Sequence, residues 1–327
     1  VAVDLNGQAP IQVFVRPRAE PTIVFHSIDL GEREEVGDSV SLRAFDNPQV
    51  RFALPRAACS LLGLPEGAFN TSLADLGGGF AVSLLAAIPK GSGLGTSSIL
   101  GGVLLAALFR YFGLTVPPAQ LYLAVLELEQ MLTTGGGWQD QIGGLAGGVK
   151  YIESRMGTTP DPIVHQLDPT LFEDSQYSSR MTLYYTGVTR LAKNILGDVV
   201  DRVNRRDPAY LFTHHTLRAL AHHARNAVSL RDYDRLCNLV AASWQENKLI
   251  HASTSNDEVE DLLGATTGLY RSMKLLGAGG GGYALFLSQT VRQADDLRET
   301  LSARARNENA RLVDFSLNRA GLQVTVS

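Results

Sequence analysis

Apolar runs separated by glycine-rich breaks extend along the whole chain of 327 residues, and the spacing within each run predicts its secondary structure. Short continuous or alternating apolar runs predict strands at residues 11–15, 22–27, 80–88, 147–152, 182–185 and 282–287, with two more in 310–327. Helical periodicity predicts helices at residues 99–112, 117–132, 191–203, 211–230, 233–250, 258–263 and 290–304. The polar stretch 153–169 contains three prolines and is predicted to connect two lobes, residues 1–155 and 170–327.

The segment from Pro89 to Ser98 places three glycines between a predicted strand and a predicted helix. Glycine lets backbone N–H groups approach an anion closely, and the start of a helix attracts negative charge. The loop is therefore a candidate phosphate site, formed by Lys90, Gly91, Ser92, Gly93, Leu94, Gly95, Thr96, Ser97 and Ser98. It matches neither the P-loop nor the dinucleotide fingerprint, so a tight turn that binds nothing remains an alternative. Lys90 is equally compatible with a solvated loop lysine.

Two further glycine-rich segments add candidate functional residues to those of the first loop. Residues 133–148 follow the predicted helix 117–132 and surround one acid, Asp140, which could also cap a turn. In that helix Glu129 lies at the border of the apolar face, where an acid is ordinarily solvated. Residues 277–282 form a third glycine loop, and the alternating apolar residues after it favour a loop fixed on a sheet over a flexible turn.

Together these segments resemble the GHMP kinase superfamily, the small-molecule kinases that include galactokinase, homoserine kinase and mevalonate kinase. Within it the match is closest to the L-fucokinase group, including the kinase half of bifunctional fucokinase/GDP-fucose pyrophosphorylases. The resemblance extends from Val1 to Ser327 and is carried by IPKGSGLGTSS (residues 88–98), TTGGGWQDQ (133–141), YTGVTR (185–190) and WQENK (244–248). It implies an α+β, two-lobed GHMP kinase fold, with a truncated ribosomal protein S5 domain 2-like N-lobe for ATP and a ferredoxin-like C-lobe.

The chain departs from the family at its start. Family members carry an N-terminal motif of the form Gly-Gly-Trp-x-Asp-x-Pro-Pro that helps to hold the sugar, whereas residues 1–15 are similar to the part that follows this motif. We therefore expect a C-terminal fragment of a longer kinase or a truncated gene product. The resemblance also allows for a nucleotidyltransferase domain upstream in the full-length protein.

The resemblance implies a role for individual residues in phosphoryl transfer from ATP. Asp140 would act as the base for the acceptor hydroxyl, and Arg190 would stabilise the transferring phosphate unless it forms a structural salt bridge. Ser97 and Glu129 would hold Mg²⁺, which prefers hard oxygen ligands. The remaining candidates are the sugar-binding residues Gly136, Gly137, Trp138 and Gln139, and the C-terminal glycine loop residues Gly277, Gly279, Gly280 and Gly281. Core packing is the alternative for Trp138 and is the favoured one when the resemblance is left aside.

The expected reaction is phosphorylation of the anomeric hydroxyl of L-fucose to L-fucose 1-phosphate, on the salvage route to GDP-fucose. A D-glycero-D-manno-heptose 7-phosphate 1-kinase has the same fold but usually lacks a tryptophan at the position of Trp138, and would need extra basic residues. An inactive sugar or nucleotide sensor is the alternative from another class; the retained Ser97, Glu129 and Asp140 argue against it.

Composition predicts a cytoplasmic enzyme with small-molecule partners, sugar and ATP, and leaves the oligomeric state open. The 29 Lys and Arg residues against 33 Asp and Glu give a net charge of -4, which excludes a basic surface for nucleic acid. No run is long and apolar enough to cross a membrane. Only two cysteines are present, so no disulfide framework is predicted. Four of the seven histidines lie in adjacent pairs at 214–215 and 222–223, where a solvent-facing helix is favoured over a metal site.

Overall fold

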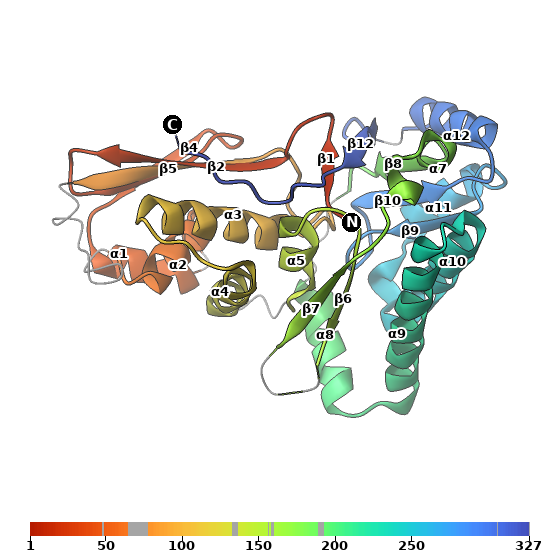
Figure 1. Cartoon of the computed structure of the whole chain (residues 1–327), viewed down its shortest axis with the longest axis horizontal. Helices are drawn as coiled ribbons and strands as arrows, with labels where there is room; N and C mark the ends of the chain where they lie inside the picture. Colours follow the sequence, from red (N-terminus) through yellow and green to blue (C-terminus); the bar gives the residue numbers. More distant parts are fainter. Residues whose placement is uncertain are drawn as a thin grey trace.

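The computed structural model describes residues 1–47, 49–64, 78–132, 137–155, 157, 160–188, 193–305 and 307–326. Helices and sheets form two lobes, with the N-lobe at the left of Figure 1 and the C-lobe at the right. This is the α+β architecture that the sequence predicts. Within the described residues, no helix has the length and apolar character needed to cross a membrane.

The N-lobe consists of a four-stranded sheet with helices packed on one face (Figure 1). The strands are ordered β2 (Ile11–Arg18), β5 (Gly79–Ala86), β3 (Ile23–Ser27) and β4 (Glu32–Val36), and only β3 and β5 are parallel. The helices are α1 (Ser39–Arg43), α2 (Ala53–Leu61), α3 (Thr96–Tyr111), α4 (Pro118–Met131) and α5 (Gln139–Leu145), with a 3-10 turn at Ala44–Asp46. The strands predicted at 11–15, 22–27 and 80–88 are confirmed.

Helix α3 is apolar around most of its circumference because it lies between the sheet and the other helices. Leu104, Leu105 and Leu108 are fully buried, and α3 packs against β2, α4 and α5. Small residues permit this close approach, since a Cβ on Gly102 would lie 2.3 Å from Leu145 Cδ1 of α5. The burial of α3 on several sides fixes where its N-terminus lies.

The C-lobe has a four-stranded antiparallel sheet in the order β11 (Arg311–Val313), β8 (Met181–Tyr185), β10 (Tyr283–Leu287) and β9 (Ser272–Leu275). Between β8 and β9 the chain forms α8 (Lys193–Asn204), α9 (Pro208–Ser229), α10 (Tyr233–Ile250), a 3-10 turn (Ala252–Thr254) and α11 (Asp257–Ala265). Helix α12 (Val291–Ala303) joins β10 to β11. This strand order and the β-α-β-β-α-β succession confirm the ferredoxin-like prediction.

The stretch 153–169 contains structure that the sequence did not predict. Strand β7 (Pro162–Gln166) pairs with β6 (Lys150–Ser154) in an antiparallel hairpin, followed by the short helices α6 (Thr170–Glu173) and α7 (Ser175–Ser178). The Tyr151 and His165 rings lie opposite each other with centroids 5.9 Å apart, and His165 Nε2 is 2.9 Å from Glu153 Oε1. The strand within this predicted connection was not recognised because polar and aromatic cross-strand pairs, and not an apolar pattern, hold the hairpin.

The two ends of the chain are paired. Strand β1 (Val3–Leu5) is antiparallel to β12 (Phe315–Leu317), and the chain beyond β12 returns over the N-lobe, where Leu322 packs against the core (Figure 1). Asn318 holds this return because its Nδ2 donates to Asp4 Oδ1 and its Oδ1 accepts from the Gly321 N–H. The two strands predicted in 310–327 are therefore present, but only β11 joins the C-lobe sheet.

We expect Asn318→Ala to lower the free energy of unfolding by about 1–3 kcal/mol, because Asp4 and the Gly321 N–H would lose their partner. Urea unfolding of the purified chain measures this difference. Ser316→Ala is the matched control, since Ser316 is exposed on the neighbouring strand and should change stability by less than about 0.5 kcal/mol. Equal effects of the two substitutions would contradict the proposed role of Asn318.

Candidate active site

The loop before α3 has the backbone conformation that its glycines predict. Gly91, Gly93 and Gly95 have φ angles of 76°, 86° and 67°, in the left-handed region that favours glycine. Gly95 is also the N-cap of α3, and no side chain caps the helix start. The first-turn N–H groups of a 16-residue helix therefore lie next to the loop without a side-chain acceptor, as an anion site requires.

The two glycine loops contact each other through their backbones. A Cβ on Gly93 would lie 2.1 Å from the Leu276 carbonyl oxygen, and one on Gly277 would lie 2.6 Å from Gly93 Cα. The Tyr283 N–H donates to the Ser92 carbonyl oxygen at 3.0 Å. The C-terminal glycine loop thus packs directly against the loop before α3, and no larger residue fits at this contact.

Asp140 lies against the start of α3. It occupies the first turn of α5, and a Cβ on Gly95 would be 2.9 Å from Asp140 Cβ and 3.4 Å from its Oδ2. The Asp140 side chain keeps an accessible face, but the protein atoms packed around its carboxyl group still raise its pKa by desolvation. A carboxyl group of raised pKa beside a candidate anion site is suited to accept a proton near a phosphate.

Glu129 is the second carboxylate at the start of α3. Its place at the border of the apolar face of α4 is compatible with a solvated side chain, but the structure buries it. Its side chain is only 5% exposed, and its Oε1 accepts a hydrogen bond of 2.5 Å from Ser98 Oγ. Burial raises the pKa of Glu129, the hydrogen bond from Ser98 opposes this shift, and the charge of Asp140 adds to it. The first turn of α3 therefore contacts two acids, one from the end of α4 and one from the start of α5.

The donor set suits Mg²⁺. Glu129 is a buried carboxylate of α4 whose charge the surrounding protein disfavours, and Ser97 is an exposed residue in the first turn of α3, next to the Ser98 that binds Glu129. Mg²⁺ is commonly bound by one or two carboxylates together with phosphate oxygens and waters. No three His, Cys, Asp or Glu side chains converge in the part of the chain that the structure describes, which includes the histidine pairs of α9.

Three of the predicted sugar-binding residues, Gly137, Trp138 and Gln139, lie at the start of α5. Gly137 and Gln139 are exposed, and Trp138 is half-buried, so part of this residue is accessible to a ligand. Sequence reasoning missed Gln141, which is fully buried and whose side-chain amide, with its nitrogen assigned toward the carbonyl oxygens of Gly137 and Trp138, would donate to them at 3.1 and 3.2 Å. Its place in the Gln-Asp-Gln element was the only signal. The predicted residues Gly136 and Arg190 lie outside the described residues.

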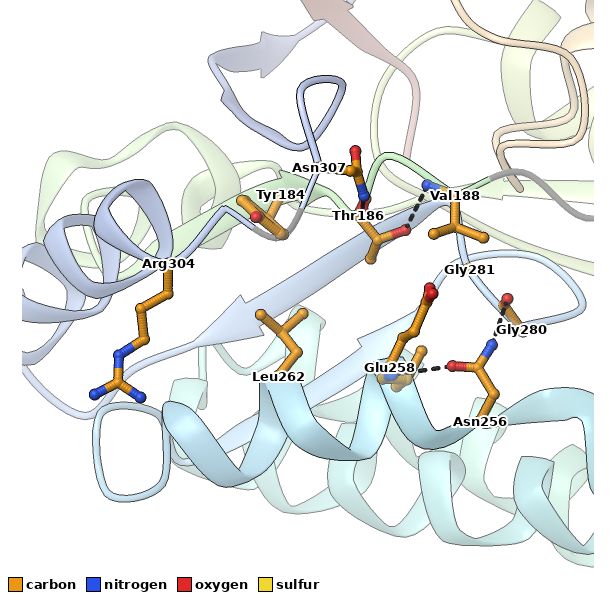
Figure 2. Close-up of a pocket in the computed structure, with 11 residues that line it drawn as sticks. Tyr184, Thr186, Val188, Asn256, Glu258, Leu262, Gly280, Gly281, Arg304 and Asn307 are labelled. Carbon is orange, nitrogen blue, oxygen red and sulfur yellow. Dashed lines mark hydrogen bonds between the residues drawn. The ribbon is translucent and has the colours of Figure 1, made fainter.

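The C-terminal glycine loop is fixed by hydrogen bonds with two residues that the sequence analysis did not single out, Thr254 and Asn256. The Gly280 N–H donates to the Thr254 carbonyl oxygen at 2.7 Å, and Asn256 Nδ2 donates to the Gly280 carbonyl oxygen at 3.0 Å. Asn256 also caps α11 by accepting from the Val259 N–H (Figure 2). In a sequence, an asparagine before a helix is explained by its role as a helix cap. Nothing in the sequence pattern therefore indicates that Asn256 also binds the Gly280 carbonyl oxygen.

A pocket opens beside this loop, between α11 and the segment after β8 (Figure 2). Gly280, Gly281, Thr186 and Asn256 line one part of it, and Arg304 marks the other end. Neither Asp140 nor Ser97 belongs to its lining. The candidate active site is therefore the surface between the two glycine loops and the acids, and not this pocket.

The fold and these motifs are similar to those of GHMP-type kinases. The family model described as GHMP kinases N terminal domain matches residues 63–148. The chain is 37% identical, over its full length, to the L-fucokinase/L-fucose-1-P guanylyltransferase of Bacteroides fragilis, and it spans 35% of that protein. Residues 63–148 therefore match a GHMP kinase N-terminal domain, and the whole chain is similar to part of this bifunctional relative.

Two other comparisons agree with this similarity. The chain is 28% identical to the D-glycero-alpha-D-manno-heptose 7-phosphate kinase of Campylobacter jejuni, over 75% of this chain and 70% of the relative. The solved structure of Streptococcus pneumoniae phosphomevalonate kinase in complex with phosphomevalonate and AMPPNP has the same fold, with a TM-score of 0.71 at 13% identity over 94% of this chain and 90% of the other.

We expect Gly93→Ala to destabilise the chain more than Gly113→Ala does. Both residues have positive φ angles, 86° and 75°, so each alanine costs about 1–2 kcal/mol in backbone strain. Only the Cβ at residue 93 meets another backbone, which should add ~1–3 kcal/mol of overpacking, whereas nothing lies within 4 Å at residue 113. Chemical unfolding of both variants measures the difference, and equal losses would show that the contact between the loops is unimportant for stability.

Proposed function

We propose that this chain is the sugar kinase unit of a longer protein, and that it transfers the γ-phosphate of ATP to the anomeric hydroxyl of L-fucose. The observation that carries the proposal is the Asp140 carboxyl group packed against Gly95, where α3 begins. This contact places a candidate base next to a candidate phosphate site. The identity to the Bacteroides fragilis fucokinase supports L-fucose as the acceptor.

The phosphates of ATP would be held mainly by backbone groups. The N–H groups of Gly93, Gly95, Thr96 and Ser97 lie in the loop and at the uncapped helix start, where the helix dipole favours negative charge. Lys90 is exposed and free of the loop's backbone contacts with the C-lobe, so its ammonium group can turn toward the phosphates. Bound Mg²⁺ would supply positive charge to the phosphate oxygens, with Ser97 and Glu129 as its protein ligands.

Asp140 would orient the sugar hydroxyl and receive its proton. As the hydroxyl oxygen bonds to the γ-phosphorus, the bond from this phosphorus to the β–γ bridging oxygen breaks, and ADP leaves with that electron pair. The proton of the hydroxyl passes to the Asp140 carboxylate, whose raised pKa makes it a better acceptor than an aspartate of ordinary pKa. Arg190 stays a proposed stabiliser of the transferring phosphate.

Trp138 and Gln139 would face the sugar together with Gly136 and Gly137. The half-buried Trp138 can lay part of its ring against the apolar face of a sugar, while Gln141 holds the backbone of this segment. We further propose lobe boundaries at residues 1–155 and 170–327, a cytoplasmic location, and a nucleotidyltransferase domain in the longer protein. The last proposal rests on the guanylyltransferase named in the relative of which this chain spans 35%.

A heptose 7-phosphate kinase is the second candidate, favoured by the identity to the Campylobacter jejuni relative. We expect product with L-fucose when the chain is incubated with ATP, Mg²⁺ and, separately, L-fucose, D-arabinose, D-galactose or heptose 7-phosphate. The sugar 1-phosphate is detected by mass spectrometry or phosphorus NMR. Product with the heptose phosphate alone would replace the proposed acceptor, and Mg-ATP binding without turnover on any sugar would support the inactive sensor.

We expect Asp140→Asn to reduce turnover by at least about 100-fold while leaving the affinity for ATP nearly unchanged, because the amide cannot accept the proton. Asp201→Asn, on the exposed face of α8, is the control and should retain activity. Steady-state kinetics and calorimetric nucleotide binding measure the two effects. Equal losses of turnover and nucleotide affinity would contradict the role of Asp140 as a base.

The same substitution should stabilise the chain at neutral pH. The fold raises the pKa of Asp140 and thus disfavours its charged form, so the carboxylate costs stability above the raised pKa. This cost disappears as pH falls through the raised value toward the unfolded value of 3.8. The gain in free energy of unfolding from Asp140→Asn should therefore be largest near pH 7–8 and vanish in acid, and a gain independent of pH would contradict this.

A further inference from the structure

Three consecutive hydroxyl residues begin α3, and the structure gives them different surroundings. Successive residues of an α-helix point about 100° apart, so Thr96, Ser97 and Ser98 cannot all face one ligand. Ser97 is exposed, whereas Ser98 is only 5% exposed and faces α4. The sequence alone assigns all three to the phosphate site.

The buried hydroxyl of Ser98 is engaged by a carboxylate. Its Oγ donates to Glu129 Oε1 at 2.5 Å, and both side chains have the same small exposed fraction, 5%. A hydrogen bond to an ionised acceptor is stronger than one between neutral groups. A phosphate oxygen could reach this hydroxyl only by displacing Glu129 from it.

We propose that Ser98 is a positioning residue, which fixes the Glu129 carboxylate beside the phosphate loop and does not itself touch the nucleotide. This rests on the proposed function, in which Glu129 is the carboxylate ligand of Mg²⁺. A free glutamate has several rotatable bonds and loses appreciable rotamer entropy when it is fixed. A hydrogen bond from a rigid helix start fixes one rotamer before the ligand arrives, as outer partners of metal ligands commonly do.

The position of Asp140 gives this restraint a second use. Asp140 lies against Gly95, at the same helix turn, and its negative charge acts on Glu129. The two acids repel each other, so Glu129 without its hydroxyl partner would gain electrostatically by turning away from Asp140. Ser98 keeps the two carboxylates in the separate places that a metal ligand and a base require.

The test compares nucleotide binding with and without the metal. We expect Ser98→Ala to weaken the Mg²⁺-dependent part of AMPPNP binding by roughly 10-fold to 100-fold in titration calorimetry. Binding of AMPPNP in excess chelator should be unchanged. Ser98→Thr keeps a hydroxyl and should recover most of the Mg²⁺ dependence, and Ser98→Cys, a weaker donor, should lie between the two.

A double-mutant cycle with Glu129→Gln separates this role from direct phosphate binding. If Ser98 acts through Glu129, Ser98→Ala should have little further effect in the Glu129→Gln background. Additive effects, or an equal loss of AMPPNP affinity with and without Mg²⁺, would overturn the proposal. Circular dichroism confirms folding of each variant, and if Ser98→Ala does not fold, Ser98→Cys replaces it in the cycle.

The wild-type chain distinguishes failure of this proposal from failure of the proposed function. Mg²⁺-dependent AMPPNP binding needs no sugar, so the result does not depend on which acceptor is used. Normal wild-type binding with an unchanged Ser98→Ala would overturn only the role of Ser98. Absence of Mg²⁺-dependent AMPPNP binding in the wild-type chain would contradict the kinase function and this role with it.

Discussion

The structure depends on a contact in which two glycine loops from different lobes touch backbone to backbone. Gly93 and Gly277 leave no room for a side chain between them, and Ser92 accepts a hydrogen bond from the Tyr283 N–H at 3.0 Å. A shared apolar cluster supports the contact, with Ile88 from the N-lobe packed near Leu183 and Tyr283 of the C-lobe. The lobes therefore contact each other at the place where we propose that phosphates bind, and the candidate site lies at the lobe interface.

The first turn of α3 organises the chemistry around this contact. Gly95 lies against Asp140 and Ser98 binds Glu129, so one helix start holds two acids that belong to α5 and α4. Burial raises the pKa of both acids, which means that the fold bears an electrostatic cost at neutral pH. Such a cost is typical of active sites, where groups are held in unfavourable surroundings because their reactivity requires it.

Sequence patterns predicted most of the buried elements and several acids, but missed elements held together by polar pairs. Strand β4 is an edge strand of sequence Glu-Arg-Glu-Glu-Val, and β7 pairs with β6 through aromatic and charged residues, so neither has an apolar strand pattern. Glu129 was singled out from a motif, although its position on the helix favoured solvent. Gln141 and Asn256 were missed because their contacts are with backbone carbonyl groups, which any sequence supplies.

The sequence by itself determined where the backbone could turn and which faces would be buried, since glycine tolerance of positive φ and apolar periodicity are local properties. It also specified the acids available near the phosphate loop. Only the tertiary structure decided that β1 pairs with β12 from the opposite end of the chain, and that Ser98 donates a hydrogen bond to Glu129. Both outcomes depend on how separate elements are placed and rotated against each other, and packing between residues far apart in the chain sets that arrangement.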